Sequence, residues 1–408
     1  NRQGTNGVHG APLGEEETAL FRKEIGWEYD PFEIPTEVYA DFKEKVADRG
    51  EAAYKSWEKL YDDYKAKYPE LASELEEVLS RKDIERLSKE SFEFKNVGEA
   101  QATRNSSQDA INSIAAVLPT FFGGSADLSH SNMTFIKGEG LQNNENRVAR
   151  NVQFGVREFG MATILNGLML HGGVRVFGGT FFVFSDYLKA ALRLSAIQNL
   201  PVTYVFTHDS IAVGEDGPTH EPIEHLASLR TIPNTYLFRP ADATEAQAAW
   251  YLSQKVNNKP TSLVLTRQNL PILENTSFEK VSKGAYVVYE TSSDFDTILI
   301  ATGSEVALAV DVARKLEKEG SKVRVVSMPS IELFEEQSKE YKEELLPRSV
   351  RRRVSLEMGN TALWYKYVGL DGLAIGIDNF GASAPANKVI EEYGFTVSKV
   401  VERIKNEL

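Results

Sequence analysis

Apolar residues recur at helical spacing through a highly charged stretch that runs from residue 35 to about 88. Four aromatic side chains fall at positions i, i+4, i+7 and i+11 and predict one stripe of an amphipathic helix, which we interpret as a packing surface: Trp57, Tyr61, Tyr64 and Tyr68. Pro69 is expected to break that helix. We therefore interpret residues 1–95 as a mainly helical linker.

From about residue 97 to 275 short apolar runs alternate with amphipathic stretches. The runs predict strands at Val148–Phe154, Val174–Phe177, Val202–Thr207, Thr235–Arg239 and Ser262–Arg267. The stretches predict helices at Glu158–Leu170, Tyr187–Ile197, Ile223–Leu229 and Ala243–Val256. This alternation predicts the α/β class, with a doubly wound and mostly parallel sheet.

A second, smaller α/β unit is predicted to begin near Gly284. A strand at Thr297–Ala301, a helix over 305–319 and a strand at Val323–Met328 form its first β–α–β unit. The predicted domains are thus 1–95, 96–278 and 279–408.

Composition narrows the class of protein. The 408 residues carry a net charge of −13, which argues against nucleic acid or an anionic membrane surface as a partner. The absence of cysteine excludes disulfides and thiolate chemistry and is typical of a reducing cytosol, so we expect a cytoplasmic protein. No apolar run is long enough to span a bilayer, and no membrane partner is expected. The Gly-rich start looks like the middle of a longer protein.

The richest candidate site is the loop 207–222, which follows the predicted strand ending at Thr207. It contains His208, Asp216 and His220. Ligands of open α/β sheets bind outside the carboxyl ends of the strands, so this loop is a candidate site. The alternative is a polar surface turn, since Gly, Pro and Asp are common in turns.

Other polar side chains stand at similar junctions. Arg104 opens a helix, where an anion could meet backbone N–H groups, and Arg267 ends a predicted strand. Gly123–Leu128 is interpreted as a glycine-rich loop that cradles a ligand or simply turns. Glu158 opens a helix and is either a charge partner of the helix N-terminus or a buried acid.

Seven motifs together resemble the transketolase family. They are HGAPL, ATR, GGSADL with SN, FGVRE-x-GM, GGTFF-x-F-x-x-Y, HDSI-x-VGEDGPTH and TRQNLP, in the order and spacing typical of that family. The resemblance implies a transferase that moves a two-carbon ketol group from a ketose phosphate to an aldose phosphate, in the pentose phosphate pathway. It also implies thiamine diphosphate, a divalent metal (Mg or Ca) and a homodimer.

The resemblance also implies roles for residues. Glu158 would hydrogen-bond a pyrimidine nitrogen of the cofactor while protonated, and His9 and His220 would act near the reacting carbonyl. The aromatic walls around the cofactor would be Phe181, Phe184 and Tyr187, with Asp127 in support and His9 also near it. The residues that would hold the sugar phosphate and its hydroxyls are His9, Arg104, Ser131, His208, Asp216, His220 and Arg267.

Two departures from the family pattern stand out. Phe159 occupies a position where the family commonly has His. No Gly-Asp-Gly motif with a following Asn appears before residue 100, so we expect the diphosphate-binding domain to be missing apart from its last loop, which holds His9. No metal ligands are assigned on this basis, and the chain is expected to be inactive alone.

Two other functions stay open. One is a beta-type subunit of a 2-oxo acid dehydrogenase, which also uses thiamine diphosphate; HGAPL, Arg104 and Arg267 argue against it. The other is a non-catalytic partner module, against which the intact Glu158 and His208 argue.

Overall fold

The computed structural model describes residues 2–408. Its internal contacts divide the chain into two compact units, Asn1–Glu74 and Leu75–Leu408. Each unit is described by itself below. None of the helices in the described residues combines the length and apolarity that crossing a lipid bilayer demands.

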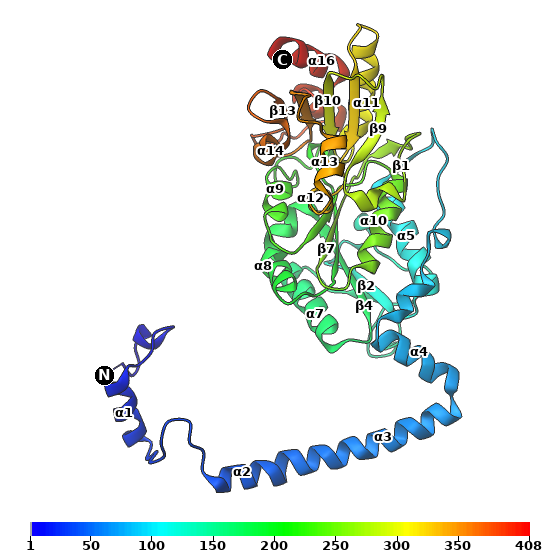
Figure 1. Ribbon diagram of the computed structural model, residues 1–408. Coiled ribbons are helices and arrows are strands. Elements are labelled where there is room, and N and C mark those ends of the chain that lie inside the picture. The colour runs from blue at the N-terminus through cyan, green and yellow to red at the C-terminus, as the bar shows by residue number, and fades with distance from the viewer. Residues whose placement is uncertain (1) are drawn as a thin grey trace. The chain divides into compact units, whose positions relative to one another are not determined.

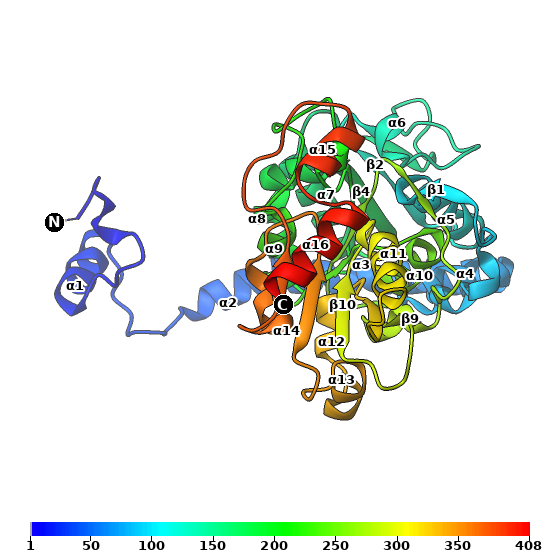
Figure 2. The same cartoon turned by 90° about the horizontal axis from the view of Figure 1, so that it is seen from above.

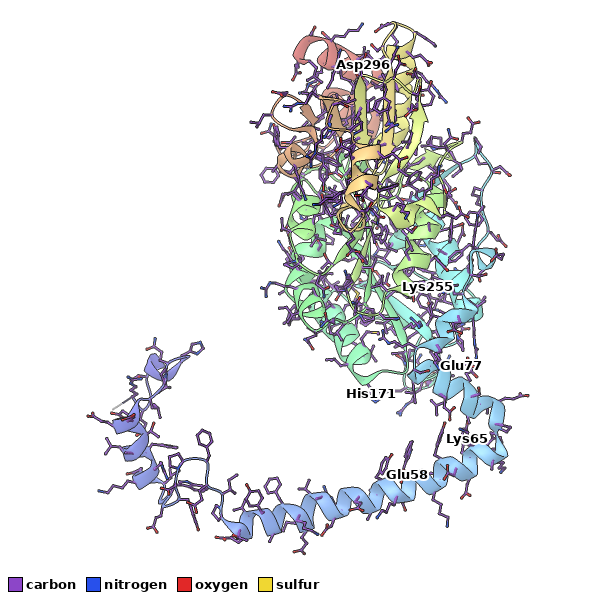
Figure 3. All side chains as sticks on the ribbon, viewed as in Figure 1. Glu58, Lys65, Glu77, His171, Lys255 and Asp296 are labelled. Carbon is purple, nitrogen blue, oxygen red and sulfur yellow. The ribbon has the colours of Figure 1, made fainter. Side chains whose placement is uncertain are left out.

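The first unit is a set of helices almost without a core. Its elements are η1 (Asn6–Val8), α1 (Glu15–Glu24), α2 (Thr36–Phe42), the π-helical η2 (Lys43–Asp48), α3 (Arg49–Lys67) and the start of α4 (Pro69–Leu79). None of the residues in α1, α2 or α3 is buried. Figure 1 shows α3 as a long single helix, and in Figure 3 its side chains, Glu58 and Lys65 among them, stand clear of the ribbon.

The predicted aromatic stripe lies on α3 and packs on itself. The rings of Trp57 and Tyr61 stack at 5.4 Å, and those of Tyr64 and Tyr68 lie 5.3 Å apart. Trp57 nevertheless keeps 52% of its surface exposed. Pro69 begins α4, as predicted, because a proline at the first helical position sacrifices no hydrogen bond.

The larger sheet of the second unit has six strands, all parallel, in the order β3-β2-β4-β5-β7-β6. Their bounds are β2 (Phe121–Ser125), β3 (Asn151–Gln153), β4 (Arg175–Phe181), β5 (Thr203–Thr207), β6 (Tyr236–Phe238) and β7 (Thr261–Leu265). A small antiparallel pair, β1 (Ala100–Ala102) and β8 (Asn269–Pro271), lies outside it. The order is that of a doubly wound sheet, which confirms the predicted fold class.

Helices cover both faces of this sheet, as Figure 1 shows. They are α5 (Thr103–Val117), α6 (Ser129–Asn132), α7 (Glu158–His171), α8 (Ser185–Ile197), α9 (His225–Arg230) and α10 (Ala243–Lys255). Successive residues of β5 point to opposite faces. Tyr204 and Phe206 pack with the core of α7 and α8, whereas Val205 packs with the core of α5 and α10.

The carboxyl-terminal part holds a five-stranded sheet in the order β13-β12-β10-β11-β9, parallel except for β9. Its strands are β9 (Tyr286–Glu290), β10 (Thr297–Ala301), β11 (Val323–Ser327), β12 (Arg352–Leu356) and β13 (Leu373–Ile375). Its helices are α11 (Glu305–Glu317), α12 (Ile331–Glu335), α13 (Lys339–Leu345), α14 (Tyr365–Val368), α15 (Ala386–Glu392) and α16 (Val397–Glu407); the last two are red in Figure 2.

Two glycine pairs lie in strands, and the first of them was expected to form a loop. Gly123 and Gly124 belong to β2, and Gly178 and Gly179 to β4. A Cβ on Gly123 would lie 2.1 Å from the carbonyl oxygen of Phe177, so glycine here permits close strand packing rather than a turn. The prediction that Gly123 and Gly124 form a loop is wrong, because glycine is favoured both in turns and where two backbones approach closely.

The last part of the predicted linker, residues 82–92, packs into the second unit more tightly than a linker would. Short 3-10 turns follow α4 at Lys82–Arg86 and Lys89–Ser91, and Leu87 and Phe92 are buried in the core of the second unit. The domain boundaries at 95 and 278 stay predictions.

Candidate active site

The carboxyl edge of the six-stranded sheet gathers most of the predicted site residues. Because all six strands are parallel, their carboxyl ends meet at one edge. Ser131 follows β2, Phe181 ends β4, His208 follows β5 and Arg267 follows β7. The order of the strands, not the order of the chain, makes these residues neighbours.

A cavity of about 300 Å³ lies at this edge. It is lined by Arg104, His130, Ser131, Met133, Phe181, His208, Asp216 and Arg267. Its walls come from segments more than 160 positions apart in the chain, so the fold assembles this cavity from distant parts of the sequence.

Arg104 and Arg267 meet because two threonines join the elements that carry them. The backbone N–H of Thr266, next to the end of β7, donates to Thr103 Oγ1 at 2.7 Å, and the N–H of Thr103 donates to Thr266 Oγ1 at 3.1 Å. This pair fixes the first turn of α5 against β7. Arg104 donates to the carbonyl oxygen of Ser131 at 2.9 Å.

The two arginines form a positive site without a carboxylate partner. Among the described residues no Asp or Glu forms a salt bridge with Arg104 or Arg267, and Nε of Arg104 is buried without a hydrogen-bond partner. Burial lowers the pKa of Arg104, and the charge of Arg267 lowers it further. An anion at this position would relieve both effects.

His208 is held by a chain of buried hydrogen bonds. Ser125 Oγ donates to the carbonyl of Gly179 at 2.8 Å, and Asn132 Nδ2 donates to Ser125 Oγ at 2.8 Å. Thr207 Oγ1 then donates to Asn132 Oδ1 at 2.7 Å and lies 2.8 Å from Nδ1 of His208. Since the Thr207 hydrogen is already donated, Nδ1 carries the ring proton and Nε2 is left as an acceptor.

The surroundings of His208 keep its ring neutral. Burial, together with the charges of Arg104, Arg267 and His220, lowers the pKa of His208 to about 3. Its backbone has φ 63°, a left-handed conformation that costs a non-glycine residue about 1 kcal/mol or more. Such strain at the end of a buried strand is typical of functional sites.

Aromatic rings form one side of the site. The rings of Phe181 and His208 lie 3.8 Å apart, and Phe181 stacks on Phe184 at 5.9 Å. Tyr187 continues the group at 6.0 Å from Phe184, while His220 contacts Phe184 edge-on at 5.5 Å. The three predicted aromatic residues are thus neighbours, although they lie on β4, η5 (Phe182–Phe184) and α8 rather than on one helix.

Glu158 begins α7 at the carboxyl end of β3, the edge strand of the sheet. Its side chain is half-buried and forms neither a hydrogen bond nor a salt bridge within residues 2–408. A carboxyl group placed at a helix start with no partner is available to an outside donor or acceptor.

A buried ion network holds the loop after β5. Asp209 pairs with Arg239 at 2.8 Å, and Arg239 also pairs with Glu305 at the start of α11. Arg230 contacts Glu357 through two hydrogen bonds of 2.7 and 2.8 Å. Burial alone would lower the pKa of Arg239, but the charges of Glu305 and Asp209 outweigh it and raise that pKa.

The loop from Gly214 to Glu221 contacts the segment that follows β13, the edge strand of the carboxyl-terminal sheet. Ser383 Oγ donates to the carbonyl of Glu215 at 2.6 Å. Glu221 is 2% exposed, and a Cβ on Gly381 would lie 1.7 Å from its carboxylate. Burial raises the pKa of Glu221 to about 7, although the backbone amides of Ala382 and Gly214 lower it in part.

The remaining predicted residues have different surroundings. Asp216 lines the cavity from an exposed position, and His220 is half-buried with Nδ1 at 2.9 Å from Thr219 Oγ1. Asp127 is exposed with φ 62°, just past β2. His9 belongs to the first unit, where it is exposed at the end of η1. The roles of all these residues stay predictions.

Sequence reasoning did not single out several residues of this site. His130 and Met133 line the cavity, Asn132 orients His208, and Glu221 closes the loop. Asn132 follows Ser131 in the recognised SN motif, which is a signal that could have found it. The depth at which Glu221 is buried has no signal in the local sequence.

Three family models describe this chain. The transketolase thiamine diphosphate binding domain matches residues 1–83, the transketolase pyrimidine binding domain matches 99–272, and the transketolase-like C-terminal domain matches 284–396.

Similar proteins agree with these matches. A Streptococcus pneumoniae protein named "Probable transketolase" is 65% identical over 406 residues, which is 100% of this chain and 62% of that protein. The transketolase of Bacillus subtilis is 52% identical over 99% of this chain and 61% of its own length. A structure of Pichia stipitis transketolase in complex with sedoheptulose-7-phosphate has a TM-score of 0.90 at 39% identity, covering 97% of this chain and 59% of that one.

The fold and the edge site define a thiamine diphosphate-type α/β protein, and the matches specify it further. The chain belongs to the transketolase family. It spans about 60% of the length of the curated relatives above.

The expectation that the diphosphate-binding domain is missing is wrong. Residues 1–83, interpreted above as a last loop and a linker, match that domain. The expectation relied on one absent motif, whereas the match covers all of residues 1–83. The expected inactivity of the chain alone had no other basis.

The residues present fit the pyrimidine end of thiamine diphosphate, because aromatic rings and an unpartnered carboxyl group suit a planar ring with nitrogen atoms. For the divalent metal the fit is lacking. Within residues 2–408 the one group of His, Asp and Glu side chains spaced for a metal ion is Asp186, Glu224 and His225, which lies at α8 and α9. We assign no ligand to the metal that the family implies.

The raised pKa of Glu221 predicts a pH-dependent stability. In the unfolded chain this carboxyl group ionises near 4.5, and in the folded chain near 7. The folded state therefore binds the proton more tightly, and stability is lost as pH rises from about 4.5 to 7. We expect Glu221→Gln to raise the Tm relative to the unsubstituted chain at pH 8, with the difference vanishing below pH 4.5. Thermal unfolding at stepped pH measures it, with exposed Glu145→Gln as the control; a difference independent of pH would contradict the assignment.

Proposed function

We propose that this chain is the part of a transketolase that binds the sugar phosphate and the pyrimidine of thiamine diphosphate, for transfer of a two-carbon ketol group from a ketose phosphate to an aldose phosphate. The observation that carries this proposal is the cavity in which Arg104, Ser131, His208 and Arg267 converge beside an aromatic wall. The bound sedoheptulose-7-phosphate of the Pichia stipitis enzyme is in accord with it.

The phosphate end rests on unpaired positive charge. Two guanidinium groups without carboxylate partners attract a dianion, and buried Nε of Arg104 gains a hydrogen-bond acceptor. His208 is neutral and presents Nε2 as an acceptor, so it suits a sugar hydroxyl next to the phosphate. Asp216 at the cavity rim suits a second hydroxyl.

The cofactor end rests on Glu158 and the rings. When bound, thiamine diphosphate supplies a carbon nucleophile and accepts the electron pair left by C–C bond cleavage. Glu158 would hold a proton at a pyrimidine nitrogen, Phe184 would stack on that ring, and Phe181 and Tyr187 would exclude water beside it. His220 and His9 would move protons at the sugar oxygens, and Asp127 would support the pocket.

An apolar face supports a homodimer. It is formed by six exposed side chains on two packed helices, Phe159, Ile164 and Leu170 on α7 and Tyr187, Leu194 and Ile197 on α8, each between 43% and 65% exposed. Asn166 of α7 donates to the carbonyl of Ala191 on α8 at 3.0 Å, so the two helices present one rigid surface. Large apolar side chains exposed on two packed helices are typical of a protein interface, and we propose a second copy as the occupant. We also propose a cytoplasmic location, in keeping with the cysteine-free sequence.

Replacing Arg267 tests the phosphate site. Arg267→Ala is expected to cost about 1.5–3 kcal/mol of binding, roughly a 10- to 150-fold higher apparent KM for phosphorylated ketoses, because a charge-assisted contact is lost. Steady-state kinetics with the whole enzyme measures it. The increase should be absent for a ketose without phosphate and in the control Arg348→Ala, whose side chain is exposed near Glu343. An equal increase for both ketoses would contradict the phosphate assignment.

Replacing Glu158 tests the cofactor site separately. Glu158→Gln is expected to slow exchange of the thiazolium proton of bound thiamine diphosphate by about 100-fold or more, because the proton-holding carboxyl group is lost. Binding of the sugar phosphate should be unchanged. Exchange followed by NMR in deuterated buffer gives the rate, with Glu145→Gln as the matched control on an exposed loop. Normal exchange in Glu158→Gln would refute the role of Glu158.

A charge on the apolar face tests the homodimer. Ile164→Glu is expected to shift the chain toward monomer at micromolar concentration, because a buried unpaired carboxylate costs several kcal/mol. Light scattering measures the mass. Leu370→Glu, at a side chain 96% exposed in the carboxyl-terminal part, should leave it unchanged. If Ile164→Glu keeps the mass of the unsubstituted chain, this face is not the interface.

A further inference from the structure

Three side chains able to bind a metal ion meet where α8 and α9 begin. Asp186 lies in the first turn of α8, Glu224 precedes α9 and His225 is its first residue. One oxygen of each carboxylate and one ring nitrogen of His225 lie within 4.8 Å of one another. These residues line no part of the cavity described above.

The state of His225 indicates a ligand independently of how the three side chains are spaced. It is only 4% exposed, and both of its ring nitrogens are buried without a hydrogen-bond partner. Nε2 lies 3.2 Å from Asp186 Oδ2 and Nδ1 lies 3.8 Å from Glu224 Oε2, but neither contact has hydrogen-bond geometry. Burying an imidazole whose two ring nitrogens have no hydrogen-bond partner is unfavourable unless a ligand contacts those nitrogens.

The cluster is short of positive charge. Among the described residues no Lys or Arg forms a salt bridge with Asp186 or Glu224. Lys189, a cation on the same helix as Asp186, instead donates to Ser228 of α9. The two helix N-termini can stabilise the carboxylates, but they offer nothing to the ring nitrogens of His225.

We propose that Asp186, Glu224 and His225 bind a divalent transition-metal ion of the Zn²⁺ type. An imidazole with two carboxylates is a donor set that Zn²⁺ accepts, whereas Mg²⁺ and Ca²⁺ prefer oxygen ligands alone. A tetrahedral ion at about 2.1 Å from its ligands spaces them roughly 3.4 Å apart. The two carboxylates are exposed and can rotate inward to that spacing, while His225 is fixed in front of the ring of Phe182 at 5.7 Å.

The ion joins two elements that border the candidate active site. α8 follows directly after Phe184, and α9 follows the loop that ends at Glu221. A bound ion fixes the first turns of both helices to each other and so stiffens both walls. This metal site depends only on the three side chains and stands whether or not the proposed function holds.

Zinc titration of the whole chain, stripped with a chelator and free of thiamine diphosphate, tests the site. Calorimetry is expected to show saturable binding of a single ion, accompanied by a rise in Tm, because a ligand of the native state stabilises it. The chain has no cysteine, so thiolates do not compete for the ion. His225→Gln and Asp186→Asn are each expected to weaken binding about 10-fold or more and to abolish the rise in Tm.

Matched controls are His171→Gln and Asp311→Asn. His171 is exposed at the end of α7, where Figure 3 labels it, and Asp311 is an exposed partner of Arg314. Both controls should bind zinc as the unsubstituted chain does. Asp186 is exposed, so its variant is informative even if His225→Gln fails to fold. Absence of saturable binding, or binding that survives Asp186→Asn unchanged, overturns the proposal.

Discussion

The buried ion network around Arg239 is the interaction on which the candidate site depends. Its guanidinium group is fully buried and joins Asp209, after β5, to Glu305, at the start of α11. Removing one partner from such a network leaves an uncompensated charge and typically costs about 3–5 kcal/mol. A Cβ on Gly303 would lie 2.8 Å from the guanidinium group of Arg239, so the backbone beside the network has no space for a larger residue. The loop after β5 is thereby fixed between two sheets.

The polar side chains of the cavity take their positions relative to this fixed loop. Asp209 is held by Arg239, so the neighbouring His208 keeps its left-handed backbone conformation and its ring meets the chain of hydrogen bonds from Gly179 to Thr207. On the other side the Thr103–Thr266 pair sets two arginines close together in spite of their repulsion. Strain, a neutral histidine and unpaired positive charge are each unfavourable alone, and together they describe a site prepared for an anionic ligand.

Much of this was predictable from the chain. Alternating apolar runs predicted the parallel sheet, and loop 207–222 was identified because it follows a buried strand of five aromatic or β-branched residues. Predictions failed where one residue type serves two purposes. Gly123 was expected in a loop, yet it allows β2 to pack closely against β4. The helical stretch before residue 83 was interpreted as a linker because it is highly charged and α3 buries no residue. It matches a domain of the family instead.

The sequence by itself determined most of the strands and helices and many of the residues able to do chemistry, because hydrophobic periodicity and residue type are local properties. It also determined the family, through motifs that keep their order. Only the tertiary structure decided which residues meet. The Thr103–Thr266 hydrogen bonds place Arg104 beside Arg267, and burial keeps the His208 ring neutral and raises the pKa of Glu221 to about 7. The junction of α8 and α9 brings Asp186 close to His225. These properties depend on distances and solvent exclusion between residues far apart in the chain, and no local pattern encodes them.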